Sequence, residues 1–257
     1  MASLKEHLII ALNTYIRNFT TLFFSIIIMA LVSLIFIIPA SFFLTSGIER
    51  LPNNETFQNS LNFQSLFLFS SVGIGFALVI LGLLVVIYLS SGFVGLCYYG
   101  IKKRVYLNTF LEVIKKRGTS YFLTTAIVGL IFSMILTSFT IFLIALQLSE
   151  NIIILFLWII MLLILPFFVL YGPAVISGKT VINSIEQSIK LGANNYVGLF
   201  VLSSIFVAAS LVNIISIPII EIILTLVNYL LIMPLFQITL CSIYIDKTKV
   251  KSRRRGK

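Results

Sequence analysis

Residues 100–121 read Gly-Ile-Lys-Lys-Arg-Val-Tyr-Leu-Asn-Thr-Phe-Leu-Glu-Val-Ile-Lys-Lys-Arg-Gly-Thr-Ser-Tyr and form a charged segment between two long apolar runs. Basic triplets mark its two ends, at 102–104 and 115–117. Between them, apolar residues recur at the spacing of one helical face: Leu107, Phe110, Leu111 and Ile114. A basic helix with one apolar face is typical of the membrane surface, where charges stay hydrated and apolar side chains meet lipid.

The composition of the whole chain also indicates a membrane protein. Of its 257 residues, 60% are hydrophobic and only 10% are charged, against about half and a quarter in soluble proteins. Backbone polar groups must be satisfied inside lipid, so spans are helices or a closed barrel, and these apolar runs lack the alternation of a barrel. We therefore predict an all-α integral membrane protein. The net charge of +10 lies in loops and a tail, so no nucleic-acid partner is expected.

Six apolar runs are long enough to cross a bilayer, which takes about 20 helical residues. They are residues 19–44, 66–89, 121–146, 152–170, 197–217 and 222–245. An interfacial amphipathic helix is predicted before each pair of spans, at residues 4–18, in the 100–121 segment and at residues 179–192. Pro166 predicts a kink, and a helix break is expected at Tyr171 to Ala174. In the second span, small residues at spacing four predict a close helix approach: Ser71 with Gly75, and Gly73 with Ala77.

Lysine and arginine are concentrated on one side of this threading. The N-terminal stretch, the loops after spans two and four, and the tail hold 2, 6, 2 and 7 of the 18 basic residues. The other side holds only Arg50. Because basic loops stay in the cytoplasm, we predict a multi-pass protein of the plasma membrane with both termini cytoplasmic.

The three pairs of spans share a pattern that predicts an internal repeat. Alignment on Asn18, Gly118 and Gly192 gives an amphipathic helix, a small or polar break and two spans in each copy. The copies are residues 3–89, 104–170 and 179–245, within one domain of residues 1–245 that a basic tail, 246–257, follows.

The second and third copies agree best, at three positions. The matched residues are Glu112 with Glu186, Lys116 with Lys190, and Phe122 with Tyr196. Parallel copies of this kind predict a symmetry axis along the membrane normal. A chain of helical hairpins with basic inner loops would show the same pattern without a true repeat.

Short motifs in the third copy carry a family resemblance. They are Pro173-Ala174-Val175-Ile176, Ser184-Ile185-Glu186-Gln187-Ser188-Ile189-Lys190, Met233-Pro234-Leu235, and Tyr244-Ile245-Asp246 followed by basic residues. The chain resembles the six-span membrane-domain family found beside glycerophosphodiester phosphodiesterases, and its free-standing bacterial and archaeal relatives. The resemblance spans nearly the whole chain and implies a fold but little chemistry. The chain has no room for the soluble phosphodiesterase domain, so hydrolase activity is not expected.

No catalytic, cofactor or metal site is predicted. The HExxH, GxSxG, P-loop and dinucleotide motifs are absent, and no span holds a pair of carboxylates. Cys97 and Cys241 show no CxxC or Cys/His spacing and are predicted to be small buried hydrophobes. His7, the single histidine, has no other candidate ligand nearby and is predicted to lie on the surface.

Polar residues inside the last two spans form a candidate site. Asn213 and Asn228 are nearly equidistant from the turn at Ile220 and Glu221, so we expect them at similar depth, with Gln237 deeper. Polar groups in lipid usually face the bundle or water. These three residues predict either a polar site on a solute path or hydrogen bonds that join the helices.

Basic residues of the inner loops are candidates for lipid-phosphate contacts. They are Lys102, Lys103, Arg104, Lys115, Lys116, Arg117, Lys179 and Lys190. Anionic lipids attract each such group by about 1 kcal/mol, although topology and headgroup anchoring alone would also place them there. The tail could contact a cytoplasmic protein, which the sequence does not identify.

These observations favour a non-enzymatic accessory or scaffold domain that interacts with lipid. The expected partner is the bilayer, with anionic headgroups at the cytoplasmic face. The alternative is a small-solute or lipid transporter, indicated by parallel copies, by Pro166 and Pro234 inside spans, and by Asn213 with Asn228. An enzyme that acts on lipids rests on the family association alone and is not predicted.

Overall fold

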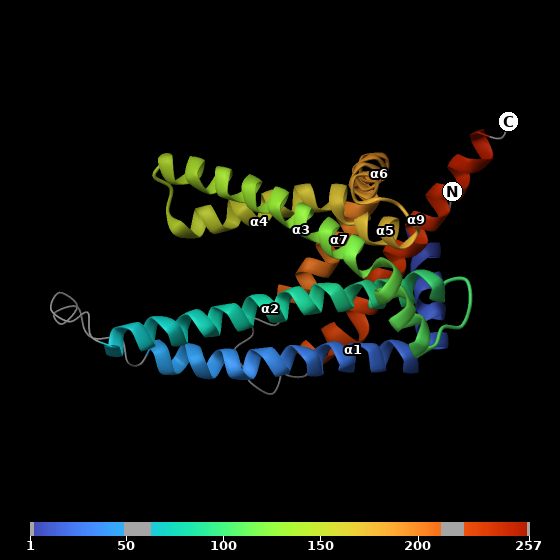
Figure 1. Ribbon diagram of the computed structural model, residues 1–257. Coiled ribbons are helices and arrows are strands. Elements are labelled where there is room, and N and C mark those ends of the chain that lie inside the picture. The colour runs from blue at the N-terminus through green and yellow to red at the C-terminus, as the bar shows by residue number, and fades with distance from the viewer. Residues whose placement is uncertain (1–2, 49–62, 212–223, 256–257) are drawn as a thin grey trace. The chain divides into compact units, whose positions relative to one another are not determined.

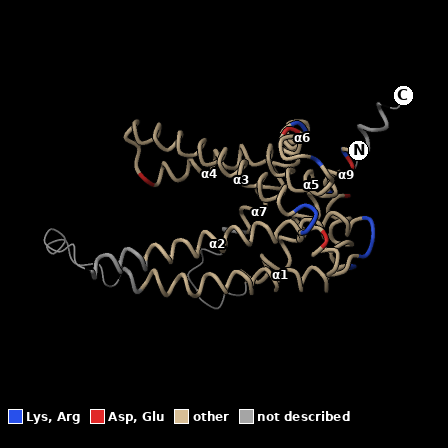
Figure 2. Tube along the Cα trace, in the orientation of Figure 1, with Lys and Arg blue, Asp and Glu red and all other residues tan. Residues whose placement is uncertain are grey.

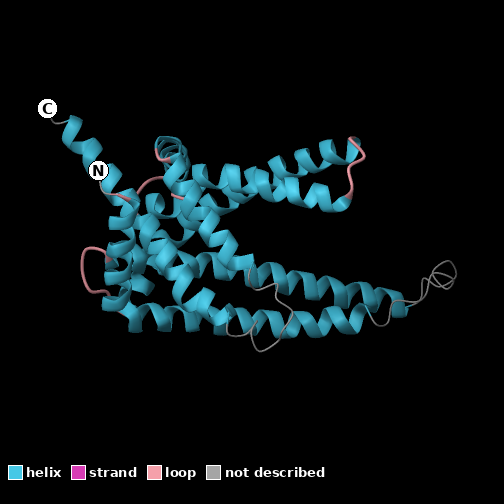
Figure 3. Ribbon diagram, turned by 180° about the vertical axis from the view of Figure 1, so that it is seen from behind, coloured by secondary structure: helices cyan, strands magenta, loops and turns pink. Residues whose placement is uncertain are grey.

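The computed structural model describes residues 3–48, 63–211 and 224–255, and within these ranges no strand occurs (Figure 3). The helices are α1 (Leu4–Ile48), α2 (Phe63–Gly100), α3 (Leu107–Ala145), α4 (Glu150–Phe168), α5 (Tyr171–Ile176), α6 (Val181–Asn194), α7 (Tyr196–Leu211), the π-helical segment η2 (Asn228–Ile232) and α9 (Met233–Arg255). The prediction of an all-α protein is confirmed.

Five stretches of the described chain are long and apolar enough to cross a membrane. They are Leu4–Thr45, Val72–Gly100, Leu107–Ala145, Glu150–Ile176 and Leu224–Thr248. The pair α6 and α7, bent by 100°, gives a sixth if it counts as one span. The predicted fifth span, 197–217, continues past Leu211 into residues that lie outside the described ranges. These lengths and hydropathies support a membrane protein.

The chain divides into two compact units. The larger unit comprises residues 1–26 and 91–257, and the smaller unit comprises residues 27–90. In the smaller unit, α1 and α2 lie side by side (Figure 1). A Cβ atom added at Gly82 would lie 2.7 Å from the Phe36 Cβ, and one at Gly75 would lie 2.7 Å from the Leu44 Cγ. The predicted close approach therefore occurs at Gly75, whereas Gly73 faces open space.

The core of the larger unit lies where the end of α2 meets α3, α5 and α9. Its largest fully buried side chains include Phe93, Phe110, Ile176, Ile238 and Tyr244. Glycines bring the helices close, because a Cβ atom at Gly95 of α2 would lie 2.5 Å from Val113 of α3. The predicted burial of Cys97 and Cys241 is confirmed, and both are free thiols.

Helix α3 runs without interruption from Leu107 to Ala145. The predicted break after Gly118, between an interfacial helix and a span, is therefore wrong. Phe110, Val113 and Gly118 are buried, whereas Leu107 and Leu111 of the predicted apolar face are 39% and 60% exposed. Phe110 of the predicted apolar face therefore packs inside the protein, while Leu107 and Leu111 of the same face lie at its surface.

The helix break predicted at Tyr171 to Ala174 lies slightly earlier, between α4 and α5, because these four residues belong to α5. Ser188 of α6 closes the break: its Oγ accepts a hydrogen bond from the Leu170 N–H at 3.1 Å and donates to the Phe167 carbonyl at 2.9 Å. Gly192, one turn later on α6, permits this contact, since a Cβ atom there would lie 2.5 Å from the Pro166 carbonyl oxygen.

A second proline interrupts the last span. Pro234 has no N–H to donate to the Leu230 carbonyl four residues earlier, and the backbone immediately before it is π-helical. The Tyr15 hydroxyl of α1 donates to that carbonyl at 2.6 Å. The proline thus leaves an acceptor that α1 uses to attach to the last span.

Candidate functional site

The predicted polar site of Asn213, Asn228 and Gln237 is only partly described by the structure. Asn213 lies outside the described residues, so its predicted contact with Asn228 has no structural test. Asn228 begins the π-helical segment, Gln237 follows nine positions later in α9, and both side chains are half-buried.

The predicted lipid-contact residues all belong to the larger unit. Seven of the eight are exposed, and Arg117 is half-buried. Figure 2 shows these basic segments at the end of the larger unit that lies away from the turn between α3 and α4. That turn carries Glu150 and no basic residue. The larger unit therefore has one basic end and one end without lysine or arginine among its described residues.

The basic loop 101–106 is held by the kink of α1. Asn18 has non-helical dihedral angles (φ −114°, ψ 15°). Its Oδ1 accepts from the Val105 N–H at 2.9 Å, and its Nδ2 donates to the Thr14 carbonyl at 2.9 Å and to the Gly100 carbonyl at 3.4 Å. Because buried backbone groups need partners, this one side chain fixes both ends of the loop.

Two neighbours of Asn18 hold the same loop. Arg17 donates to the Gly100 and Ile101 carbonyls, and the Thr21 hydroxyl donates to the Val105 carbonyl at 3.0 Å. Arg17 lies in the segment that the sequence predicts to be an interfacial amphipathic helix. The structure uses it to present Lys102, Lys103 and Arg104 at the surface.

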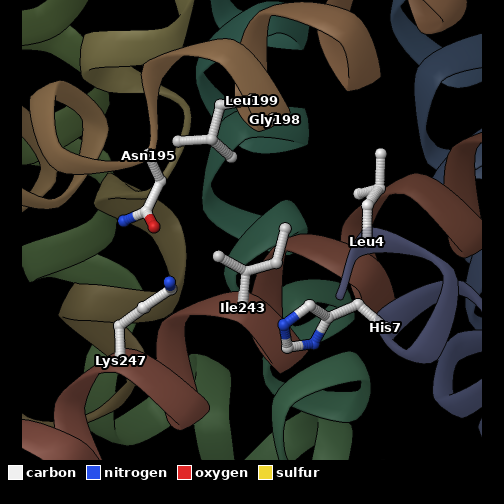
Figure 4. Close-up of a pocket in the computed structure, with 7 residues that line it drawn as sticks. All are labelled: Leu4, His7, Asn195, Gly198, Leu199, Ile243 and Lys247. Carbon is white, nitrogen blue, oxygen red and sulfur yellow. The ribbon is translucent and has the colours of Figure 1, made fainter. Parts of the chain in front are cut away.

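A cavity of about 140 Å³ lies at the basic end of the larger unit (Figure 4). The start of α1, the α6–α7 break and the middle of α9 line it, with residues Leu4, His7, Asn195, Gly198, Leu199, Ile243 and Lys247. The first turn of α1 is fixed by a capping box, in which the Ser3 N–H donates to the Glu6 carboxylate at 2.7 Å and the Glu6 N–H donates to the Ser3 hydroxyl at 3.3 Å.

His7 is buried, with 3% of its surface exposed, so the prediction of a surface histidine is wrong. Its Nδ1 lies 2.8 Å from the Ser242 hydroxyl. Its Nε2 lies 4.0 Å from the Asp246 Oδ2, too far for a hydrogen bond. Neither of these two buried atoms has a hydrogen-bond partner. Unsatisfied buried polar atoms are costly, so we take this pair and the cavity beside it as the candidate site.

The sequence contained part of this signal. Ser3 and Glu6 have the spacing of a capping box that starts a helix just before His7, and Ser242 and Asp246 are four residues apart on one helical face. Nothing in the sequence brings residue 7 to residue 242, because that contact depends on how α1 and α9 pack. His7, Asp246 and Lys247 were therefore missed as site residues.

The cavity lining carries both polar and apolar side chains. Within the described residues, no group of three or more histidine, cysteine or acidic side chains could hold a metal ion. His7 is held by Ser242 and lies beside Asp246, and Lys247 lines the cavity with it. The lining offers an ammonium group, an imidazole and an amide around apolar walls.

Comparisons with models of known protein families, with curated proteins and with solved structures found no match. The resemblance to the membrane-domain family associated with glycerophosphodiester phosphodiesterases therefore stays a prediction. What the chain does must be argued from its own geometry.

Proposed function

We propose that the protein is a non-enzymatic membrane domain that gathers anionic lipid headgroups at a basic cytoplasmic face. In this proposal the chain crosses the plasma membrane six times as three hairpins, and both termini are cytoplasmic. Basic loops are retained on the cytoplasmic side, and the cytoplasmic leaflet carries the anionic lipids. The basic end of the larger unit would then lie against those headgroups.

The observation that carries this proposal is the exposure of the basic side chains on a loop with a fixed backbone. Lys102, Lys103 and Arg104 are exposed, while the ends of their loop are hydrogen-bonded to Asn18. A preorganised group of charges loses less conformational entropy when it binds than a mobile one does. This arrangement favours a surface that holds headgroups over one that only sets topology.

The interior of the described spans gives less support to the alternative, a small-solute or lipid transporter. The buried hydroxyls of Ser25, Thr124 and Thr239 donate to carbonyls of their own helices. These three hydroxyls need no water or solute to be satisfied, whereas the buried Ser203 hydroxyl of α7 has no hydrogen-bond partner among the described residues. The transporter remains a prediction that rests on the parallel copies, on Pro166 and Pro234, and on Asn213 with Asn228.

The test replaces Lys102, Lys103 and Arg104 with glutamine and compares the anionic lipid that co-purifies with the protein from a defined mixture of phosphatidylglycerol and phosphatidylcholine. Each charge contributes about 1 kcal/mol, or about fivefold, so we expect the loss of three charges to lower the enrichment of phosphatidylglycerol by at least about tenfold. The control exchanges lysine and arginine at the same three positions, which keeps the charge and should keep the enrichment. Equal enrichment in the glutamine variant and the wild type would refute the proposal.

A further inference from the structure

The cavity at the α6–α7 break holds a buried hydrogen-bonding atom that the fold leaves unused. The His7 Nδ1 is engaged by Ser242, and the Nε2 is buried without a partner. Asp246, 4.0 Å from Nε2, carries a carboxylate that accepts but does not donate when ionised. Its charge favours the tautomer with the hydrogen on Nε2, with the Ser242 hydroxyl as donor to Nδ1. His7 then presents an N–H donor at the cavity.

The start of α7 forms a second wall of the cavity. The chain breaks at Asn195 (φ −130°, ψ 26°), and α7 begins at Tyr196. Gly198 therefore lies in the first turn, whose N–H groups have no partners within the helix and carry the positive end of the helix dipole. Gly198 lines the cavity, and a Cβ atom added there would meet nothing within 4 Å. A ligand can therefore approach this backbone closely.

Lys247 completes the cavity with a positive charge from α9. A lysine ammonium, an imidazole N–H and a helix N-terminus are three groups that bind phosphate oxygens. The opposing charges are Asp246, beside His7, and Glu6 on the exposed side of α1. The cavity, about 140 Å³, is much larger than the roughly 10–15 Å³ that one water requires.

We propose that this cavity is a specific site for one phosphate group, bound by Lys247, the His7 Nε2–H and the first turn of α7. The group is either the headgroup phosphate of a lipid or free phosphate, which present the same oxygens. The lipid source rests on the proposed function, because it requires the basic end to face the headgroups. Leu4, Leu199 and Ile243 would then contact the apolar part of the lipid that adjoins its phosphate.

The test fills the cavity without changing its charges. Gly198→Leu places a side chain in the open space beside the helix start. Gly129→Leu in α3 is the matched control, because a Cβ atom at Gly129 also meets nothing within 4 Å and the residue is distant from the cavity lining in the chain. The second variant is Lys247→Gln, and its control is Lys5→Gln at an exposed position. If Gly198→Leu does not fold, Lys247→Gln tests whether the cavity binds phosphate.

Two measurements on the purified full-length protein distinguish the sources. Native mass spectrometry counts phosphatidylglycerol molecules retained in mild detergent, and thermal unfolding in phosphate-free buffer measures the shift on adding inorganic phosphate. A retained lipid that is lost in Gly198→Leu and kept in Gly129→Leu supports a lipid phosphate. A stabilisation by inorganic phosphate that disappears only in Gly198→Leu supports free phosphate. Lys247→Gln should weaken either binding about fivefold.

The proposal is overturned if the wild type binds neither probe, or if both cavity variants bind like their controls. The surface test separates this result from a failure of the proposed function. If the Lys102, Lys103 and Arg104 glutamine variant loses lipid enrichment while Gly198→Leu keeps both its retained lipid and its stabilisation by inorganic phosphate, the proposed lipid-gathering surface is supported and the phosphate site is refuted. If neither variant changes lipid retention and Gly198→Leu responds to inorganic phosphate like the wild type, both proposals are refuted.

Discussion

The first half of α3 and the α6–α7 pair carry similar residues at matched positions and differ in backbone course. Glu112, Lys116 and Phe122 correspond to Glu186, Lys190 and Tyr196. Yet α3 continues as one helix to Ala145, whereas α6 ends at Asn194 and α7 leaves it at 100°. The shared residues therefore do not determine whether the chain bends between them.

The residue at the bend explains the difference. Asn195, at the break, corresponds to Tyr121 in α3. The Asn195 side chain donates from Nδ2 to the Leu191 carbonyl at 2.8 Å, so it satisfies an acceptor that a helix end leaves free. Tyr121 cannot do so, and its ring instead packs in the core 5.8 Å from the ring of Tyr171. A polar residue that caps its own helix permits the turn, and a buried aromatic residue keeps the helix continuous.

The largest effect on stability is expected at Gly192, where α6 packs closely against the end of α4. In Gly192→Ala, the added methyl would lie 2.5 Å from the Pro166 carbonyl oxygen and 2.8 Å from the Phe167 Cα, and backbone atoms yield little. Overpacking of this kind costs about 1–3 kcal/mol, which should lower the melting temperature in detergent. Gly129→Ala, in open space, should gain up to about 1 kcal/mol from helix propensity. Similar melting temperatures for the two variants would show that α6 does not depend on this contact.

The next effect concerns Asn18, which aligns with Gly118 and Gly192 and bends α1 by bonding to the neighbouring loop. Asn18→Leu leaves the buried Val105 N–H without its acceptor, at a cost of about 1–3 kcal/mol. Hydrogen exchange of the amides in loop 101–106 should rise about tenfold or more. Exposed Asn108→Leu at the start of α3 is the control and should leave that exchange unchanged. Protection that persists in Asn18→Leu would mean that other contacts hold the loop.

The features that the sequence predicts correctly are those that depend on composition and local chain chemistry. Apolar runs predict the span-capable helices, and the helix break expected at Tyr171 to Ala174 lies only slightly earlier, between α4 and α5. The failures depend on tertiary packing. Periodicity assigns Leu107 and Leu111 to the same face as Phe110, but lipid and protein are both apolar surroundings, so hydrophobicity alone does not tell which apolar side packs inward.

The candidate site residues also divide into those that local sequence predicts and those that depend on tertiary packing. The predicted basic residues are exposed at one end of the larger unit because charge patterning is a local property. His7 was predicted to be exposed because a lone histidine without nearby ligands gives no sign of burial. Its burial follows from the packing of α1 against α9, where His7 contacts Ser242, a residue 235 positions later in the chain. A contact between residues so far apart in the chain produces no local sequence pattern that could predict it.

The smallest effect concerns the bend at Asn195 itself. Spin labels at Ile182 and Val201, both exposed, lie on opposite sides of the break, and labels at Asn108 and Ile127 occupy the matched exposed positions of α3. Nineteen helical residues span about 28 Å, so the α3 pair should show a narrow distance distribution near that length and the α6–α7 pair a shorter distance. Asn195→Ala removes one hydrogen bond, worth about 1 kcal/mol, and should broaden the α6–α7 distribution toward longer distances. An unchanged distribution would mean that packing of α6 on the α4–α5 break, rather than the Asn195 cap, sets the bend, and the contrast with Tyr121 would then lose its physical cause.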